Sequence, residues 1–188
     1  FTPVPSLILR GIPAVPSAGR FTGWSGPRTK SPTLTVRVPA DVNYLQTSFV
    51  DTLPDGVSTT LSNTSAECTV AGTGASCALP PALAPLPTSG QQVGLYVGDL
   101  TAESFDRFIT VRYTVTVLDV PGNVAGHIAT NTAGARWTTN PLTPAPTTIA
   151  DALALPNGAG PATADVTLLE PDLSIDKLRT SPAPALSG

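Results

Sequence analysis

A run of ten residues at 108–117, FITVRYTVTV, alternates apolar and polar side chains almost without a break. A period of two residues places one set of side chains on each face of an extended strand. A helix would distribute the same residues around its whole surface. The run therefore predicts a β-strand with one apolar and one polar face, and the other segments must fit a fold that contains it.

Other segments repeat this signal between frequent turn residues. With 21 prolines and 16 glycines in 188 residues, little uninterrupted sequence is left for long helices. Further strands are predicted at residues 6–9, 34–38, 44–50, 57–61, 93–97, 126–137 and 165–169, with a shorter one near 21–24. One helical turn is predicted within 101–107, an irregular proline-containing connection at 79–90, and a Pro/Thr/Ala-rich loop at 138–163.

Short strands separated by turn signals predict an all-β fold, an antiparallel β-sandwich with long Pro/Thr/Ala-rich loops. Apolar residues make up 41% of the chain, which is enough to bury a core. Residues 1–170 are predicted to form one module. The pattern of residues 5–9 recurs weakly at 171–175, so residues 171–188 are predicted to be a linker and the first strand of a following module.

The charge and motif content argues against several functional classes. Charged residues make up 12% of the chain, the net charge is −3, and no basic cluster predicts a nucleic-acid partner. The chain contains no run of 18 apolar residues, so we expect no membrane contact within this fragment. His127 is the single histidine and no Gly-x-Ser-x-Gly motif occurs, so a hydrolytic triad has no support. We expect no enzyme activity, no cofactor and no metal.

Two cysteines, Cys68 and Cys77, flank the Gly-rich octapeptide TVAGTGAS. Their close spacing across a turn predicts a disulfide that staples a hairpin. The alternatives are two free buried thiols or half of a metal site, but no Cys-x-x-Cys motif occurs to support zinc. The disulfide predicts an oxidising, extracellular compartment.

Two polar residues fall in strand-like segments 80 positions apart, Asp51 and Asn131. Asp51 opens the sequence DTLPDG, whose last three residues favour a tight reversal. Asn131 shares one face of the predicted strand 126–137 with three alanines. On residue type alone, Asp51 caps the turn and Asn131 is a buried amide that satisfies backbone groups, and this is the interpretation that we favour within the module.

The order of motifs resembles a family. VPA at 38–40, DTLPDG at 51–56, GDL at 98–100, ITVRYTV at 109–115, NTA at 131–133 and EPDLSIDK at 170–177 are together similar to the repeat modules of bacterial surface adhesins and fimbrial proteins. The resemblance covers roughly residues 34–177. It implies a tandem, extracellular, immunoglobulin-like, collagen-adhesin-like sandwich that serves as a stalk or an adhesive unit.

The resemblance also implies a self-forming Lys–Asn isopeptide bond in many members. Asp51 matches the position of the family's acid and Asn131 the position of its asparagine. The lysine is expected on the first strand, where this chain carries Arg10 and Gly11. Lys30 is the first lysine, predicted to be exposed at a strand edge, whereas Lys177 fits the lysine position of the following module.

The function predicted from the sequence is a non-catalytic stalk or spacer repeat of a large bacterial surface protein, extracellular and attached to the cell surface or wall. Neighbouring modules of the same protein are its expected partners. The alternative is an adhesin domain that binds a glycan or protein ligand through the 10–32 and 138–163 loops. A glycan hydrolase is the least favoured, since no pair of carboxylates is spaced for it.

Overall fold

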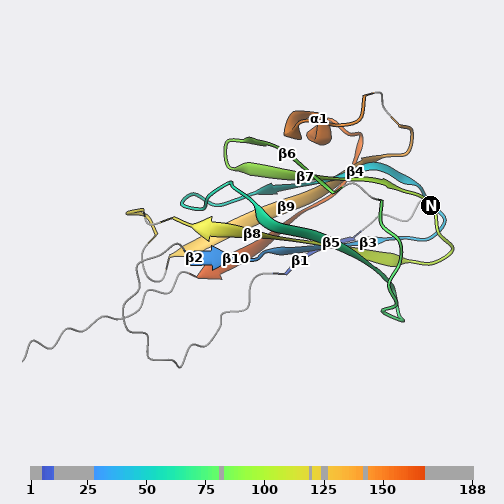
Figure 1. Cartoon of the computed structure of the whole chain (residues 1–188), viewed down its shortest axis with the longest axis horizontal. Coiled ribbons are helices and arrows are strands. Elements are labelled where there is room, and N and C mark those ends of the chain that lie inside the picture. The colour runs from blue at the N-terminus through green and yellow to red at the C-terminus, as the bar shows by residue number, and fades with distance from the viewer. Residues whose placement is uncertain are drawn as a thin grey trace, which may run out of the picture.

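The computed structural model describes residues 6–10, 28–80, 83–118, 120–123, 127–141 and 144–167. Within them the chain forms two five-stranded sheets and one short helix, α1 (Ile149–Leu153), on the outside (Figure 1). The strands are β1 (Ser6–Arg10), β2 (Arg28–Lys30), β3 (Thr33–Val38), β4 (Tyr44–Thr52), β5 (Ser62–Val70), β6 (Ala84–Ser89), β7 (Gln92–Leu100), β8 (Arg107–Val117), β9 (Ile128–Thr138) and β10 (Asn157–Thr167).

The two sheets pack face to face as an immunoglobulin-like antiparallel β-sandwich, which confirms the predicted fold class. In sheet I, β8 pairs with β3 and β2 on one side and with β5 on the other, and β1 lies outside β3. Sheet II has the order β10-β9-β4-β7-β6. β1 also lies beside β10, so the β1 edge of sheet I meets the β10 edge of sheet II.

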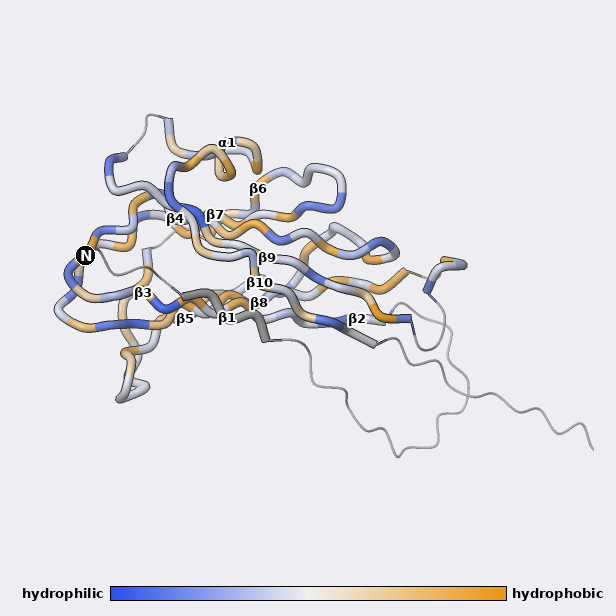
Figure 2. Tube along the Cα trace, turned by 180° about the vertical axis from the view of Figure 1, so that it is seen from behind, coloured by the Kyte–Doolittle hydropathy of each residue, from blue (hydrophilic) through white to orange (hydrophobic). Residues whose placement is uncertain are grey.

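β8 is the strand predicted from the alternating run, and the structure confirms its two faces. Ile109, Val111, Tyr113 and Val115 point into the sandwich and are at most 4% exposed. Arg112 lies on the opposite, solvent-facing side, where it forms an ion pair with Glu67 of β5. Figure 2 shows hydrophobic (orange) stretches interspersed with paler and blue ones along several of the strands.

β2 and β3 behave as one strand with an interruption. Lys30 lies opposite Val115 of β8 and Thr33 lies opposite Arg112, so the two intervening residues on each side keep the register. Pro32 accounts for the interruption, because it has no N–H to donate to the ladder. This continuous register places Lys30 on the inner side of sheet I.

The 138–163 segment is not the loop that the sequence predicted, because it contains α1 and the first part of β10. A capping box starts α1: the Thr148 hydroxyl accepts from the N–H of Asp151, and the Asp151 carboxylate accepts from the N–H of Thr148 at 3.0 Å. Five residues are too few to show a helical period. β10 begins eight residues before the predicted strand, in Gly/Ala-rich sequence of low strand propensity.

Three other local predictions were wrong. The 79–90 connection contains β6, an edge strand in which Pro85 and Pro87 are tolerated because an edge has an unpaired side. The 101–107 segment forms no helical turn; the guanidinium of Arg107 instead donates to the carbonyl of Thr101. Residues 57–61 contribute one isolated bridge, from Val57 to Val117, before β5 begins. The strand predicted near 21–24 lies outside the described residues.

A second, smaller apolar cluster attaches α1 to the outer face of sheet II. It consists of Val50, Leu86, Ile149 and Ala152, with Tyr96 packed against it. Gly94 of β7 leaves room for this contact, since a Cβ there would lie 3.0 Å from the Ile149 side chain. Across the described residues no helix has the length and apolar character that crossing a membrane requires.

Candidate functional site

Asp51 and Asn131 lie next to each other in the core of the sandwich. Asp51 lies within β4, not in the turn that follows, and its neighbour on β9 is Ala133, two residues from Asn131. Both side chains point inward, with exposed fractions of 2% and 7%. The amide of Asn131 donates to Oδ2 of Asp51 at 2.9 Å. The two residues therefore form a buried acid–amide pair on adjacent strands of sheet II.

Tyr113 joins this pair from the opposite sheet. Its ring lies in the core at 1% exposure, and its hydroxyl donates to the same Oδ2 atom of Asp51. Sequence reasoning did not single out Tyr113. The available signal was a hydroxyl-bearing ring on the apolar face of the 108–117 strand, because a buried tyrosine hydroxyl needs a hydrogen-bond partner.

The pair is electrostatically unusual. Burial raises the pKa of Asp51 to about 7, and the hydrogen bond from Asn131 opposes this rise only in part. Two oxygen atoms in the cluster have no hydrogen-bond partner, Oδ1 of Asp51 and Oδ1 of Asn131. Buried polar atoms normally have partners, so this arrangement favours a neutral carboxyl group that can itself donate.

The positions of the strands determine which lysine faces this pair. The Tyr113–Asp51 hydrogen bond shows that β8 faces β4 across the sandwich. The β1 edge of sheet I meets the β10 edge of sheet II. β2 and β3 lie on the β1 side of β8, and β9 lies on the β10 side of β4, so β2 and β3 face β9 across the sandwich. The bridge between Val57 and Val117 places the end of β4 at the end of β8.

Lys30 and Asn131 consequently lie at the same level on facing strands. Towards the end of β4, Asn131 is the next inward residue of β9 after Ala133, which pairs with Asp51. On the facing strand of sheet I, position 32 lies opposite Tyr113. Lys30 is the next inward-facing residue, two positions further towards the end of β8. Lys30 is half-buried, whereas the sequence predicted an exposed strand edge.

The other positions named for the lysine fall largely outside the structure. Lys177 and Gly11 lie outside the described residues, as does the predicted linker and following strand at 171–188. Arg10 is the last residue of β1, opposite Thr33 of β3. The structure therefore brings Asp51 and Asn131 together and places the strand of Lys30 across from them.

The predicted disulfide is present between Cys68 and Cys77, with their Cα atoms 5.0 Å apart. Cys68 lies in β5 with its side chain in the core, and the N–H of Cys77 donates to its carbonyl at 3.0 Å. The bond thus closes the Gly-rich turn after β5 and fixes the adjoining chain to the strand.

Breaking this disulfide is expected to lower the free energy of unfolding by about 2 kcal/mol, because the closed loop is short. The Cys68→Ala/Cys77→Ala double variant and the reduced wild type should show the same loss in urea unfolding. A double variant as stable as the oxidised wild type would contradict this prediction.

The acidic residues near the β7–β8 connection are already engaged. Asp99 accepts from the N–H of Gln46, and Asp106 accepts from Arg37 and from the N–H of Ala40. No group of three His, Cys, Asp or Glu side chains that could hold a metal ion occurs among the described residues. His127 is exposed at the start of the β9 segment.

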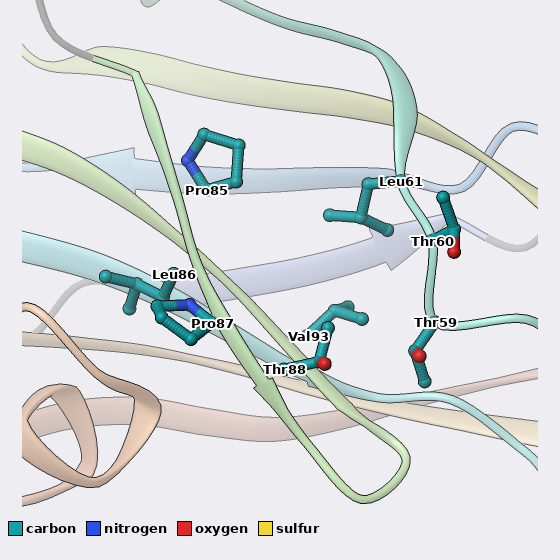
Figure 3. A pocket seen from close by; sticks show the side chains of 8 residues that line it. All are labelled: Thr59, Thr60, Leu61, Pro85, Leu86, Pro87, Thr88 and Val93. Atoms are coloured by element: carbon teal, nitrogen blue, oxygen red, sulfur yellow. The ribbon is translucent and has the colours of Figure 1, made fainter.

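A shallow groove of about 410 Å³ lies between the β6–β7 hairpin and the segment that leads to β5 (Figure 3). Its lining is uncharged and consists of Thr59, Thr60, Leu61, Pro85, Leu86, Pro87, Thr88 and Val93. Such a lining offers hydroxyl groups and apolar contacts but no acid, base or nucleophile pair.

No protein-family model matches the chain, and no curated protein matches it. Solved structures similar in fold include the full-length pilus protein RrgB of Streptococcus pneumoniae, at 13% identity and a TM-score of 0.46. That match covers 73% of this chain and 23% of RrgB, so the chain spans less than a quarter of that protein.

Two further structures are also similar. The collagen-binding subdomain of the Enterococcus faecalis surface protein ACE matches at 14% identity, with 78% of this chain and 99% of that chain covered and a TM-score of 0.39. AvmM, which catalyses macrocyclisation in alchivemycin A biosynthesis, matches at 12% identity over 92% of each chain with a TM-score of 0.43. At these identities the similarity concerns the fold alone.

Proposed function

We propose that this chain is a non-catalytic structural module of a bacterial surface protein, a stalk or spacer whose sheets are joined by an amide cross-link between Lys30 and Asn131. The observation that carries the proposal is the buried Asp51–Asn131 pair at the level of Lys30. The two sheets of a sandwich lie about 10 Å apart, and a lysine and an asparagine side chain together span that gap. A bond there would fasten sheet I to sheet II.

The chemistry requires no cofactor. The Lys30 amine in its neutral form attacks Cγ of Asn131, a C–N bond forms, the bond from Cγ to Nδ2 breaks, and ammonia leaves with the transferred proton. A neutral Asp51 carboxyl polarises the Asn131 amide, a role that its raised pKa supports. The product is an ordinary amide, and neither an oxidant nor a reductant is consumed.

A load-bearing role outside the cell fits these features. The disulfide of Cys68 and Cys77 is a second covalent link within the module, and disulfides persist in oxidising surroundings. The described part of the outer face of sheet I carries threonines and ion pairs such as that of Arg37 with Asp106. Neighbouring modules of the same surface protein are the proposed partners.

Intact mass spectrometry of the oxidised full chain tests the cross-link. The wild type is expected to weigh one ammonia less than its sequence and disulfide require, and Asn131→Ala and Lys30→Arg should abolish this loss. Lys177→Arg is the matched control and should keep it. Loss of the deficit in Lys177→Arg alone would assign the lysine to the other end of the chain, and a full wild-type mass would overturn the cross-link.

The alternative function is an adhesin domain with a glycan or protein ligand. The uncharged groove beside β6 favours it, but the 138–163 segment proposed as a binding loop contains α1 and the first part of β10. A glycan and host-protein binding array separates the two functions. A spacer is expected to bind nothing, whereas saturable binding that is lost on Leu61→Asp substitution would favour the adhesin.

A further inference from the structure

The two oxygen atoms of Asp51 have different surroundings. Oδ2 accepts from the Tyr113 hydroxyl of sheet I and from the Asn131 amide of sheet II. A carboxyl oxygen has about two lone-pair sites, so these two donors saturate it. Oδ1 is buried and has no partner, and the one other buried atom without a partner in the described core is Oδ1 of Asn131.

We propose that Tyr113 is a positioning residue that confines the proton of neutral Asp51 to Oδ1, from which it is donated to Oδ1 of Asn131. A neutral carboxylic acid and a primary amide are complementary, because each offers one donor and one acceptor side by side. Donation from Asn131 Nδ2 to Asp51 Oδ2 is already present, and the return donation satisfies both unpartnered oxygens with a single proton.

The surroundings of the pair favour the neutral acid. Burial raises the pKa of Asp51 to about 7, against the lowering effect of the hydrogen bond from Asn131. Of the elements packed around it, β8 presents Tyr113 and Val111, β9 presents Asn131, and β7 presents the apolar Val93. Apart from Tyr113, Lys30 on β2 is the titratable residue nearest in register among the described strands, and Asp151 lies in α1 on the outer side of sheet II.

The inference deepens the proposed cross-link, on which its chemical consequence rests. A proton held on Oδ1 polarises the Asn131 carbonyl towards attack, whereas a proton on Oδ2 would disrupt the bond from Asn131 Nδ2. Without Tyr113 both oxygens accept the proton. We therefore expect Tyr113→Phe to slow ammonia loss roughly tenfold, a fraction of what a general acid contributes to a rate.

The first experiment follows the Asp51 carboxyl by ¹³C NMR as the pH is raised, in the full chain labelled at aspartate. Tyr113→Phe keeps the ring but removes a donor that favours the ionised carboxyl, so the midpoint of Asp51 should rise by roughly one pH unit. Tyr44→Phe is the matched control, since Tyr44 is also buried but packs against Trp137. It should leave the midpoint unchanged.

The second experiment measures ammonia loss over time by mass spectrometry, in chain recovered in urea and then refolded. A wild type that never loses ammonia would refute the cross-link, and the NMR midpoint would still decide the role of Tyr113. An unchanged Asp51 midpoint in Tyr113→Phe overturns the positioning role. A raised midpoint with an unchanged rate of ammonia loss would overturn its chemical consequence.

Discussion

The free energy of unfolding is expected to fall by about 2 kcal/mol between pH 5 and pH 7, because each pKa unit corresponds to about 1.4 kcal/mol. The cause is Asp51, whose pKa lies near 7 in the folded chain and at the ordinary value of 3.8 once exposed. Over this range the folded state binds more protons than the unfolded state. The contribution of Asp51 to the free energy of unfolding is therefore fully present below its pKa in the unfolded chain, and it is lost as the pH rises through its pKa in the folded chain.

Asp51→Asn removes the titrating group. Because it also removes the acid of the proposed cross-link, the comparison concerns the slope of the free energy of unfolding with pH and not its absolute value. The new amide can accept from Tyr113 and Asn131 at one atom and donate to Asn131 Oδ1 at the other, as the neutral acid does, but it does not titrate. Urea unfolding at several pH values should show a slope in the wild type that is absent in Asp51→Asn. The difference between the two proteins removes contributions from exposed groups. Equal slopes would show that Asp51 is already ionised at pH 5.

The strands were predictable where apolar and polar side chains alternate, so that one face of the strand is apolar and the other is polar. β8 and β3 follow from period-two sequences whose apolar residues are the ones buried in the structure. α1 and β10 were missed for opposite reasons. The helix is one short turn held by a capping box and by packing on sheet II, and β10 is rich in small residues that pair with the alanines of β9. Tertiary contacts decided both.

The candidate site was predictable in part. Its acid and amide stood out because they match the acid and asparagine positions of the modules that the sequence resembles, yet their contact depends on the pairing of β4 with β9. Tyr113 contacts Asp51 from the other sheet, so no local sequence pattern predicts that it belongs to the site. The inward position of Lys30 depends on β2 and β3 pairing with β8 in one continuous register. The sequence does not indicate this continuity, because Pro32 interrupts the strand pattern.

Ile109→Ala is expected to lower the free energy of unfolding by about 3–4 kcal/mol, a loss large enough to threaten folding of a module of ordinary stability. Ile109 is fully buried at the centre of β8, between β3 and β5 and facing sheet II. Removing its methylene and methyl groups leaves a cavity that close-packed strands on both sides cannot fill.

Ile128→Ala is the matched control, because Ile128 at the start of β9 is 59% exposed. The same atoms are removed there with little change in burial, so the loss should stay within about 0.5 kcal/mol. Urea unfolding of both variants, under oxidising conditions that keep the disulfide, measures the contrast. Equal losses would mean that sheet I and sheet II do not share the core assigned to them. A loss at Ile109 alone would show that the alternation of β8, from which the fold was first inferred, also supplies much of its stability.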